Sequence, residues 1–184
     1  MSEETLIRFC APTLAGIKSA NLFSCEYASK TELLADVRRL NRILTPKGLR
    51  LIPLRIRQGK ALAYLYRPDR LEKDLREESC KELLRENGYE EMTVSGCLGI
   101  LRRKLRSQED FPHEIGLFLS YPPEDVRGFI HDGASRCKMT GCWKVYGDTE
   151  KAEKTFRRYH HCRESYSRQW GRGVEFSRLI VSAL

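Results

Sequence analysis

The stretch LRLIPLRIRQGKALAYLY, residues 49–66, has the pattern of a β-hairpin and is the starting point for predicting the fold. Two runs of apolar and β-favouring residues, 49–56 and 61–66, flank the short connection Arg57-Gln58-Gly59-Lys60. A short connection that contains glycine is typical of a tight turn between antiparallel strands. The stretch therefore predicts two paired strands.

Amphipathic helices are predicted on both sides of this hairpin. Before it, Ser29 and Glu32 fit a capping box, and apolar residues then recur at helical spacing until Pro46. After it, a charged helical stretch begins after Pro68-Asp69 and ends at Asn87-Gly88. Further helices are expected over residues 94–105, from 123 to 133, and from 148 or 149 onwards.

Two more strands complete the predicted sheet. Residues 115–121 form an apolar run bounded by prolines, and residues 143–146 alternate in polarity. The predicted fold class is α+β: a single domain over residues 1–184, with a small mixed or antiparallel sheet of about four strands covered by amphipathic helices. The strands are the hairpin near 49–66 and single strands near 115–121 and 142–147.

Composition limits the classes of protein to consider. Hydrophobic residues make up 41% and charged residues 32% of the 184 residues, which is a globular balance. No linker or repeat is visible, the start lacks the pattern of a signal peptide, and no apolar run approaches the roughly 18 residues of a membrane helix. The seven cysteines are an odd number without an export signal, so we expect free thiols, a cytoplasmic location and no membrane insertion.

Positive charge favours anionic partners. The sequence has 33 Lys and Arg against 25 Asp and Glu, a net charge of +8. Much of this excess comes late in the chain, because residues 151–184 carry eight Lys or Arg against three Glu.

Three segments resemble a known family. They are CAPTLAGIK at residues 10–18, FPHEIGLFLSYPPEDV at 111–126 and WKVYGD at 143–148. At these segments the chain is similar to domain-of-unknown-function family 3793, and the similarity runs along the whole chain. The resemblance implies a small cytosolic protein from bacteria, but it implies no activity, ligand or catalytic residue.

One hypothesis is thiol-dependent chemistry on a small polar or anionic molecule. Cys10 lies two residues before Pro12, which indicates a helix start or an elbow, and the N–H groups at a helix start favour a thiolate. His113 directly precedes a predicted strand. The order Cys, His and then an acid matches papain-like cysteine hydrolases, so Cys10, His113 and Asp148 are the candidate catalytic residues. Asp125 or Glu114 are alternative partners for the histidine.

A pocket for such a ligand would be built from segments 10–18 and 111–126. Lys18, Glu114 and Tyr121 are its candidate ligand-binding residues, since they supply charge and hydrogen bonds beside Cys10 and His113. The competing interpretation is structural, because a free cysteine such as Cys10 is more often a small buried hydrophobe. Whether the protein is an enzyme stays open at this point.

A metal site is weighed and disfavoured. Cys137, Cys142, His160 and Cys162 are suitable zinc ligands by type, with His161 next to them. The spacing of the first pair is loose, and Cys162 falls on the apolar stripe of the last predicted helix. No metal or other cofactor is therefore predicted.

The alternative function is non-catalytic binding of nucleic acid or an acidic partner. Arg157, Arg158, Arg163 and Arg168 alternate with aromatic residues in the last helix, a combination that holds single-stranded nucleic acid through phosphate pairing and base stacking. The aromatic residues also have the spacing of a core-facing stripe. Exposure of the four arginines would support this function.

Overall fold

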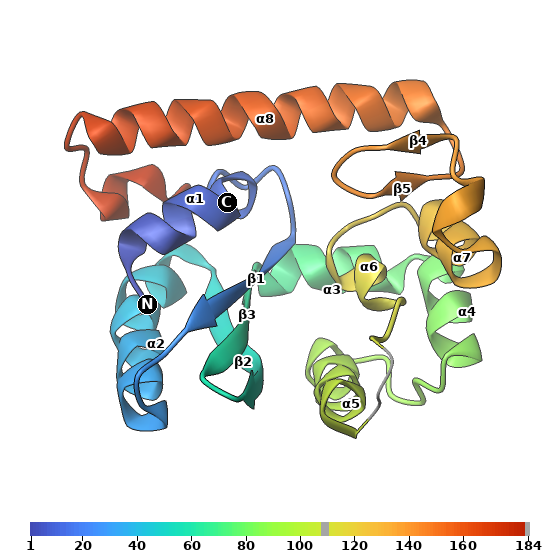
Figure 1. Ribbon diagram of the computed structural model, residues 1–184, viewed down its shortest axis with the longest axis horizontal. Helices are drawn as coiled ribbons and strands as arrows, with labels where there is room; N and C mark the ends of the chain where they lie inside the picture. The colour runs from blue at the N-terminus through green and yellow to red at the C-terminus, as the bar shows by residue number, and fades with distance from the viewer. Residues whose placement is uncertain (108–110, 183–184) are drawn as a thin grey trace. The chain divides into compact units, whose positions relative to one another are not determined.

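The structure is a computed structural model that describes residues 1–107 and 111–182. Helices and two small antiparallel sheets confirm the predicted α+β fold class. The chain divides into two units, which we describe separately: the first comprises Met1–Arg70 and Cys162–Leu184, and the second comprises Leu71–His161. Figure 1 shows the order of the helices and strands. The single domain over residues 1–184 stays a prediction.

The first unit contains a three-stranded antiparallel sheet in the order β1-β3-β2. Its strands are β1 (Ala20–Glu26), β2 (Arg50–Arg57) and β3 (Lys60–Tyr66). Arg57 faces Lys60 across the turn, where Gln58 and Gly59 both have positive φ, at 51° and 75°. Two such residues match a two-residue hairpin turn whose twist suits the strands. The predicted hairpin is confirmed, whereas strand β1 was not predicted.

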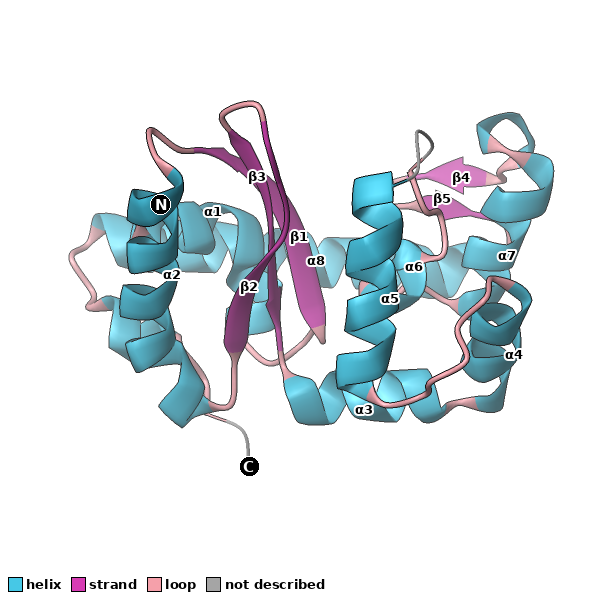
Figure 2. Cartoon of the chain, turned by 90° about the horizontal axis from the view of Figure 1, so that it is seen from below, coloured by secondary structure: helices cyan, strands magenta, loops and turns pink. Residues whose placement is uncertain are grey.

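Two helices cover one face of this sheet: α1 (Glu3–Leu14) and α2 (Lys30–Leu44) (Figure 2). Ser29 Oγ accepts a hydrogen bond from Glu32 N at 3.1 Å, so the predicted cap of α2 is confirmed. Leu6 from α1 and Leu33 from α2 pack with Phe23 and Leu65 of the sheet in one buried cluster. Full burial of each such side chain contributes about 1.5–3 kcal/mol.

The edge strand β2 is protected against pairing with another chain. Asn41 of α2 donates from Nδ2 to Leu51 O at 2.8 Å, and its Oδ1 accepts from Leu51 N at 2.9 Å. The strand also contains Pro53, beside a register shift between Pro53 and Arg55. A proline and a bulge both interrupt the regular ladder that an added strand needs.

The buried guanidinium of Arg67 joins both chain segments of the first unit. It donates to Thr13 O at 2.7 Å, Leu14 O at 2.8 Å and Val181 O at 2.6 Å. Thr13 and Leu14 are the last residues of α1, where unpaired carbonyls and the helix dipole favour a cation. The segment before Val181 contains the short helix η3 (Phe176–Leu179), whose apolar residues enter the core.

The second unit consists mainly of helices. The charged stretch after the hairpin, predicted as one helix, forms two, which are separated at Glu77. The elements from this stretch onwards are α3 (Pro68–Arg76), α4 (Glu78–Glu86), α5 (Val94–Ser107), α6 (Ile115–Phe118), α7 (Pro123–Asp132), η2 (Ala134–Arg136), β4 (Met139–Thr140), β5 (Lys144–Val145) and α8 (Thr149–Gly171). Helix α3 begins within the first unit, and α8 ends within it. The first unit also contains a short helix, η1 (Thr45–Lys47), which follows α2.

The predicted strand at 115–121 is wrong, because this segment forms the short helix α6 and a turn. Ile115 N and Leu117 N donate to carbonyls three residues earlier, and Tyr121 N returns to Gly116 O at 3.0 Å. The segment thus satisfies its backbone groups locally and needs no partner strand. Its uniformly buried apolar residues carry no periodicity that distinguishes a strand from a helix. The other predicted strand corresponds to β5, which pairs with β4.

The buried carboxylate of Asp125 organises the loop before α8. Its Oδ2 accepts from Trp143 Nε1 at 2.7 Å, and its Oδ1 accepts from Tyr146 N and Gly147 N at 2.7 and 2.8 Å. Asp125 lies in the first turn of α7, where the helix dipole also favours a negative charge. Three donors from the 143–147 loop thereby converge on α7.

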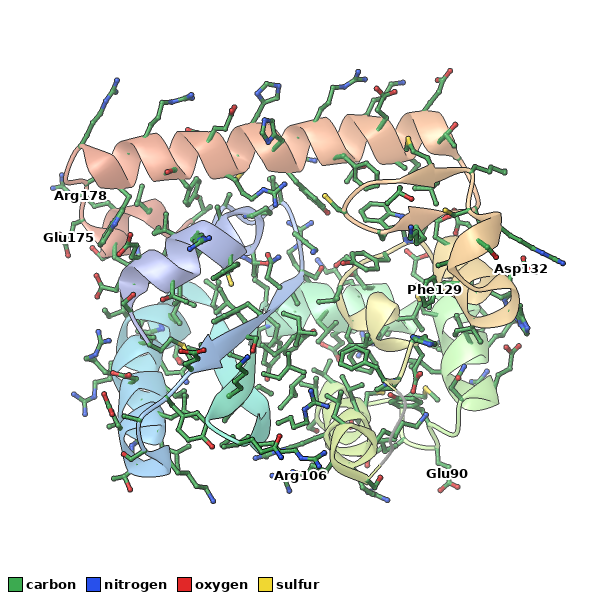
Figure 3. The ribbon with its side chains drawn as sticks, viewed as in Figure 1. Glu90, Arg106, Phe129, Asp132, Glu175 and Arg178 are labelled. Carbon is green, nitrogen blue, oxygen red and sulfur yellow. The ribbon has the colours of Figure 1, made fainter. Side chains whose placement is uncertain are left out.

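Removal of the Asp125 carboxylate is expected to destabilise the protein strongly. Asp125→Ala leaves three donors without their acceptor, so we expect a loss of about 3 kcal/mol or more in the free energy of unfolding, measured by urea denaturation. The matched control is Asp132→Ala on the same helix, whose carboxylate is exposed and pairs with Arg136 (Figure 3). This control should change stability by less than about 0.5 kcal/mol. Equal effects would contradict the assigned role.

Candidate functional site

Cys10 lies in the core of the first unit. It is fully buried, and it belongs to the last part of α1 rather than to a helix start. The helix begins at Glu3 because Ser2 Oγ accepts from Thr5 N. It continues through Pro12, which has no N–H to donate to Arg8 O. Burial raises the pKa of the Cys10 thiol, and the nearby charge of Lys18 offsets only part of this rise. The expected helix-start position is therefore wrong.

The other two candidate catalytic residues belong to the second unit. His113 is exposed, and its ring meets the edge of Phe129 at 4.8 Å between centroids and 83° between planes. Asp148 is exposed and caps α8, since its Oδ1 accepts from Lys151 N at 3.0 Å. The structure assigns each residue a local role in its own unit.

The candidate ligand-binding residues form hydrogen bonds within the protein or are buried in it. Glu114 is buried and accepts from Lys104 Nζ at 2.6 Å and from Tyr89 Oη at 3.2 Å. Tyr121 Oη donates to Cys142 O at 3.3 Å, and burial raises the pKa of Tyr121 to about 12. Lys18 is buried in the first unit. Glu114 and Tyr121 thus contribute to packing in the second unit.

The candidate metal ligands are divided between the two units. Cys137, Cys142 and His160 belong to the second unit, and Cys162 packs against the core of the first. Within residues 1–107 and 111–182, no group of three or more His, Cys, Asp or Glu side chains is placed to hold a metal ion. The same residues include no helix of the length and apolar character that membrane crossing requires.

All four candidate arginines of α8 are exposed. Arg157 pairs with Glu153 at 3.3 Å. Arg158 lines a hollow of about 400 Å³ with Lys151 and Lys154, and two carboxylates, Asp148 and Glu150, line it as well. These two lysines were not predicted as binding residues, although positions 151, 154 and 158 fall on one helical face by their spacing. Arg163 and Arg168 lie on the part of α8 that belongs to the first unit.

A second hollow, of about 550 Å³, lies in the second unit beside α5. Glu90, Glu91 and Arg103 line it together with Gly96 and Gly99. Its two carboxylates outnumber its one lining cation, which makes it unsuited to an anionic ligand. Neither hollow is lined by Lys18, Glu114 or Tyr121.

The net charge divides sharply between the two units. The first unit has 17 Lys and Arg against 8 Asp and Glu, a net charge of +9, whereas the second has 16 against 17, a net charge of −1. Within the described residues of the first unit, Asp36 and Glu3 pair with Arg39 or the amino terminus. Because 17 Lys and Arg outnumber 8 Asp and Glu, ion pairs inside the first unit cannot neutralise all of its positive charge.

Most of these cations are accessible to a ligand. Thirteen of the 17 are arginines, which pair with phosphate through two parallel hydrogen bonds more readily than lysines do. The exposed cations of the first unit are Arg8, Lys30, Arg38, Arg39, Arg42, Arg50, Arg57, Lys60, Arg70, Arg163, Arg168, Arg172 and Arg178. Figure 3 shows Arg178 after the end of α8.

The fold and the charge division define an α+β protein with one strongly basic unit and one nearly neutral unit. The chain belongs to the family described as "Protein of unknown function (DUF3793)", whose sequence profile matches residues 6–180. The match covers nearly the whole chain and confirms the resemblance noted at its three segments. No curated protein matches the chain, and no solved structure matches it.

The thiols should differ in reactivity according to burial. Cys10, Cys80 and Cys97 are buried, and burial raises the pKa of Cys80 to about 12 and of Cys97 to about 11. Because the thiolate is the reactive form, we expect iodoacetamide at about pH 8 to leave these three thiols unmodified in the native protein. Peptide mass spectrometry identifies the modified sites, and in urea all seven thiols should react. Rapid alkylation of Cys10 in the folded protein would contradict its burial and would support the hypothesis of a reactive thiolate.

Proposed function

We propose that this protein is a cytoplasmic, non-catalytic nucleic-acid-binding protein, and that its first unit carries the binding surface. The observation that carries the proposal is the net charge of +9 on that unit beside −1 on the other. A field of one sign attracts a polyanion and raises its rate of association. Free thiols agree with a reducing cytoplasm.

The kind of cation favours nucleic acid over a partner that offers only carboxylates, because arginine pairs with both anions but also stacks on nucleobases. Arginine presents a planar fork of donors that fits phosphate oxygens, and it also stacks on flat aromatic surfaces such as nucleobases. Thirteen exposed cations on different elements of the first unit supply more contacts than one small anion needs. An extended polyanion uses such a distributed surface, because each neutralised phosphate releases bound counterions.

The thiol-dependent alternative is less well supported. A nucleophile must reach its substrate, yet Cys10 is fully buried and its thiol pKa is raised. Among residues 1–107 and 111–182, no observation favours a small-molecule reaction over binding, so the binding role is the better proposal.

The first unit should dominate binding of a mixed-sequence oligonucleotide. The double variants Arg38→Glu/Arg42→Glu on α2 and Arg168→Glu/Arg172→Glu at the end of α8 reverse exposed charge in this unit. At about 50 mM salt, we expect each to weaken binding about tenfold or more by fluorescence anisotropy, and the wild-type affinity should fall steeply as salt rises.

The matched control is Arg102→Glu/Arg106→Glu on α5 of the second unit. It has the same spacing, the same exposure class and the same change in net charge as the first-unit variants. Its affinity should stay within about threefold of the wild type. Failure of the wild-type protein to bind any oligonucleotide at low salt would overturn the proposal, and so would equal losses in all three variants.

A further inference from the structure

The first unit exposes an aromatic side chain on α1. Phe9 is 41% exposed, which sets it apart from the aromatic residues that are buried in the core. Its ring lies nearly parallel to that of Phe23 on β1, with 5.7 Å between centroids and 4° between planes. A centroid separation this large in a parallel pair means that the rings are offset, so Phe23 covers Phe9 only in part.

The exposed guanidinium of Arg8 lies over the same ring. Its central carbon is 5.2 Å from the centroid of Phe9, within the range of a cation–π contact. The Arg8 side chain is itself exposed. An exposed guanidinium over a partly exposed ring places a stacking surface and a phosphate-pairing group on neighbouring residues of one helix, and a base that stacks on Phe9 takes the place of the guanidinium over the ring.

We infer that Phe9 and Arg8 form a stacking platform for a base of single-stranded nucleic acid. This inference rests on the proposed function and narrows it from nucleic acid in general to a strand whose bases are unpaired. The ring of Phe9 supports one face of the base, and the guanidinium of Arg8 stacks on the base or pairs with its phosphate. Duplexes do not offer a base for this contact, because their bases are stacked inside the helix.

Charge selects this platform over the other exposed phenylalanine. Phe111 is 38% exposed, a similar fraction, but it belongs to the unit with a net charge of −1. Phe9 lies in the unit with a net charge of +9, where the phosphates of a strand are attracted. Phe111 is therefore the natural control residue for Phe9.

The test uses the full chain and two labelled probes with equal numbers of phosphates. One probe is oligodeoxythymidylate of about 16 nucleotides, and the other is an abasic strand of the same length. Anisotropy at about 50 mM salt compares the wild type with Phe9→Leu, Phe9→Trp, Arg8→Lys and Phe111→Leu. Circular dichroism melting confirms that each variant is folded.

Stacking of one base contributes about 5- to 150-fold in affinity, so Phe9→Leu should lose at least about fivefold for the thymidylate probe. Its affinity for the abasic strand should not change, because charge alone holds that probe. Phe9→Trp should retain binding, Phe111→Leu should match the wild type, and Arg8→Lys, which keeps the charge but loses the planar guanidinium, should weaken the thymidylate complex more than the abasic one.

Two outcomes separate this inference from the proposed function. If the wild type binds both probes equally and Phe9→Leu matches Phe111→Leu, the platform is overturned while nucleic-acid binding stands. If the wild type binds neither probe, the proposed function and the platform both fail. If polyglutamate displaces thymidylate at equal charge concentration, the proposed function and the platform are both overturned, and an acidic protein becomes the expected partner.

Discussion

The first unit depends on one buried cation, the guanidinium of Arg67. The unit is assembled from two segments far apart in the sequence, and Arg67 bonds to carbonyls in both, at the end of α1 and at Val181. Burial lowers the pKa of this guanidinium, as desolvation of a charged group must. Carbonyl oxygens and the negative end of α1, rather than a carboxylate, compensate the charge. Arg67 thus connects the two segments of the unit, and no carboxylate side chain is needed for this connection.

This solution influences the electrostatics of the whole unit. A buried Arg–carboxylate pair would cancel its own charge, whereas a cation held by carbonyls leaves its full charge in the field of the unit. The second unit uses the opposite arrangement, because Glu114 pairs with Lys104 and several exposed carboxylates pair with neighbouring arginines. Arg67 therefore contributes one charge that no carboxylate among residues 1–107 and 111–182 cancels by contact, and the numbers of Lys, Arg, Asp and Glu in each unit set the rest of the difference in net charge.

Local sequence signals predicted the parts of the fold that are locally determined. The turn at Gln58-Gly59 and the cap at Ser29 both depend on adjacent residues, and both were predicted correctly. Residues 115–121 were mispredicted because a short, uniformly apolar run suits a buried strand as well as a helical turn. Pro12 was taken as a sign of a helix start near Cys10, although Ser2 begins the helix earlier. The burial of Cys10 is a tertiary property that its neighbours in sequence do not encode.

The basic surface could not be located from the sequence either, because it depends on which segments the fold brings together. Counting charge along the chain located an excess in residues 151–184, yet this segment is divided between both units at His161 and Cys162. Arg157 and Arg158 therefore belong to a nearly neutral unit, while Arg163 and Arg168 add to a basic unit that takes 13 of its 17 cations from residues 1–70. A polyanion responds to the charge gathered in space, so the chain order of the arginines is a poor guide to the surface that attracts it. The same reasoning explains why Phe9, which is far from the arginine-rich segment in sequence, acquires significance only once the fold places it in the basic unit.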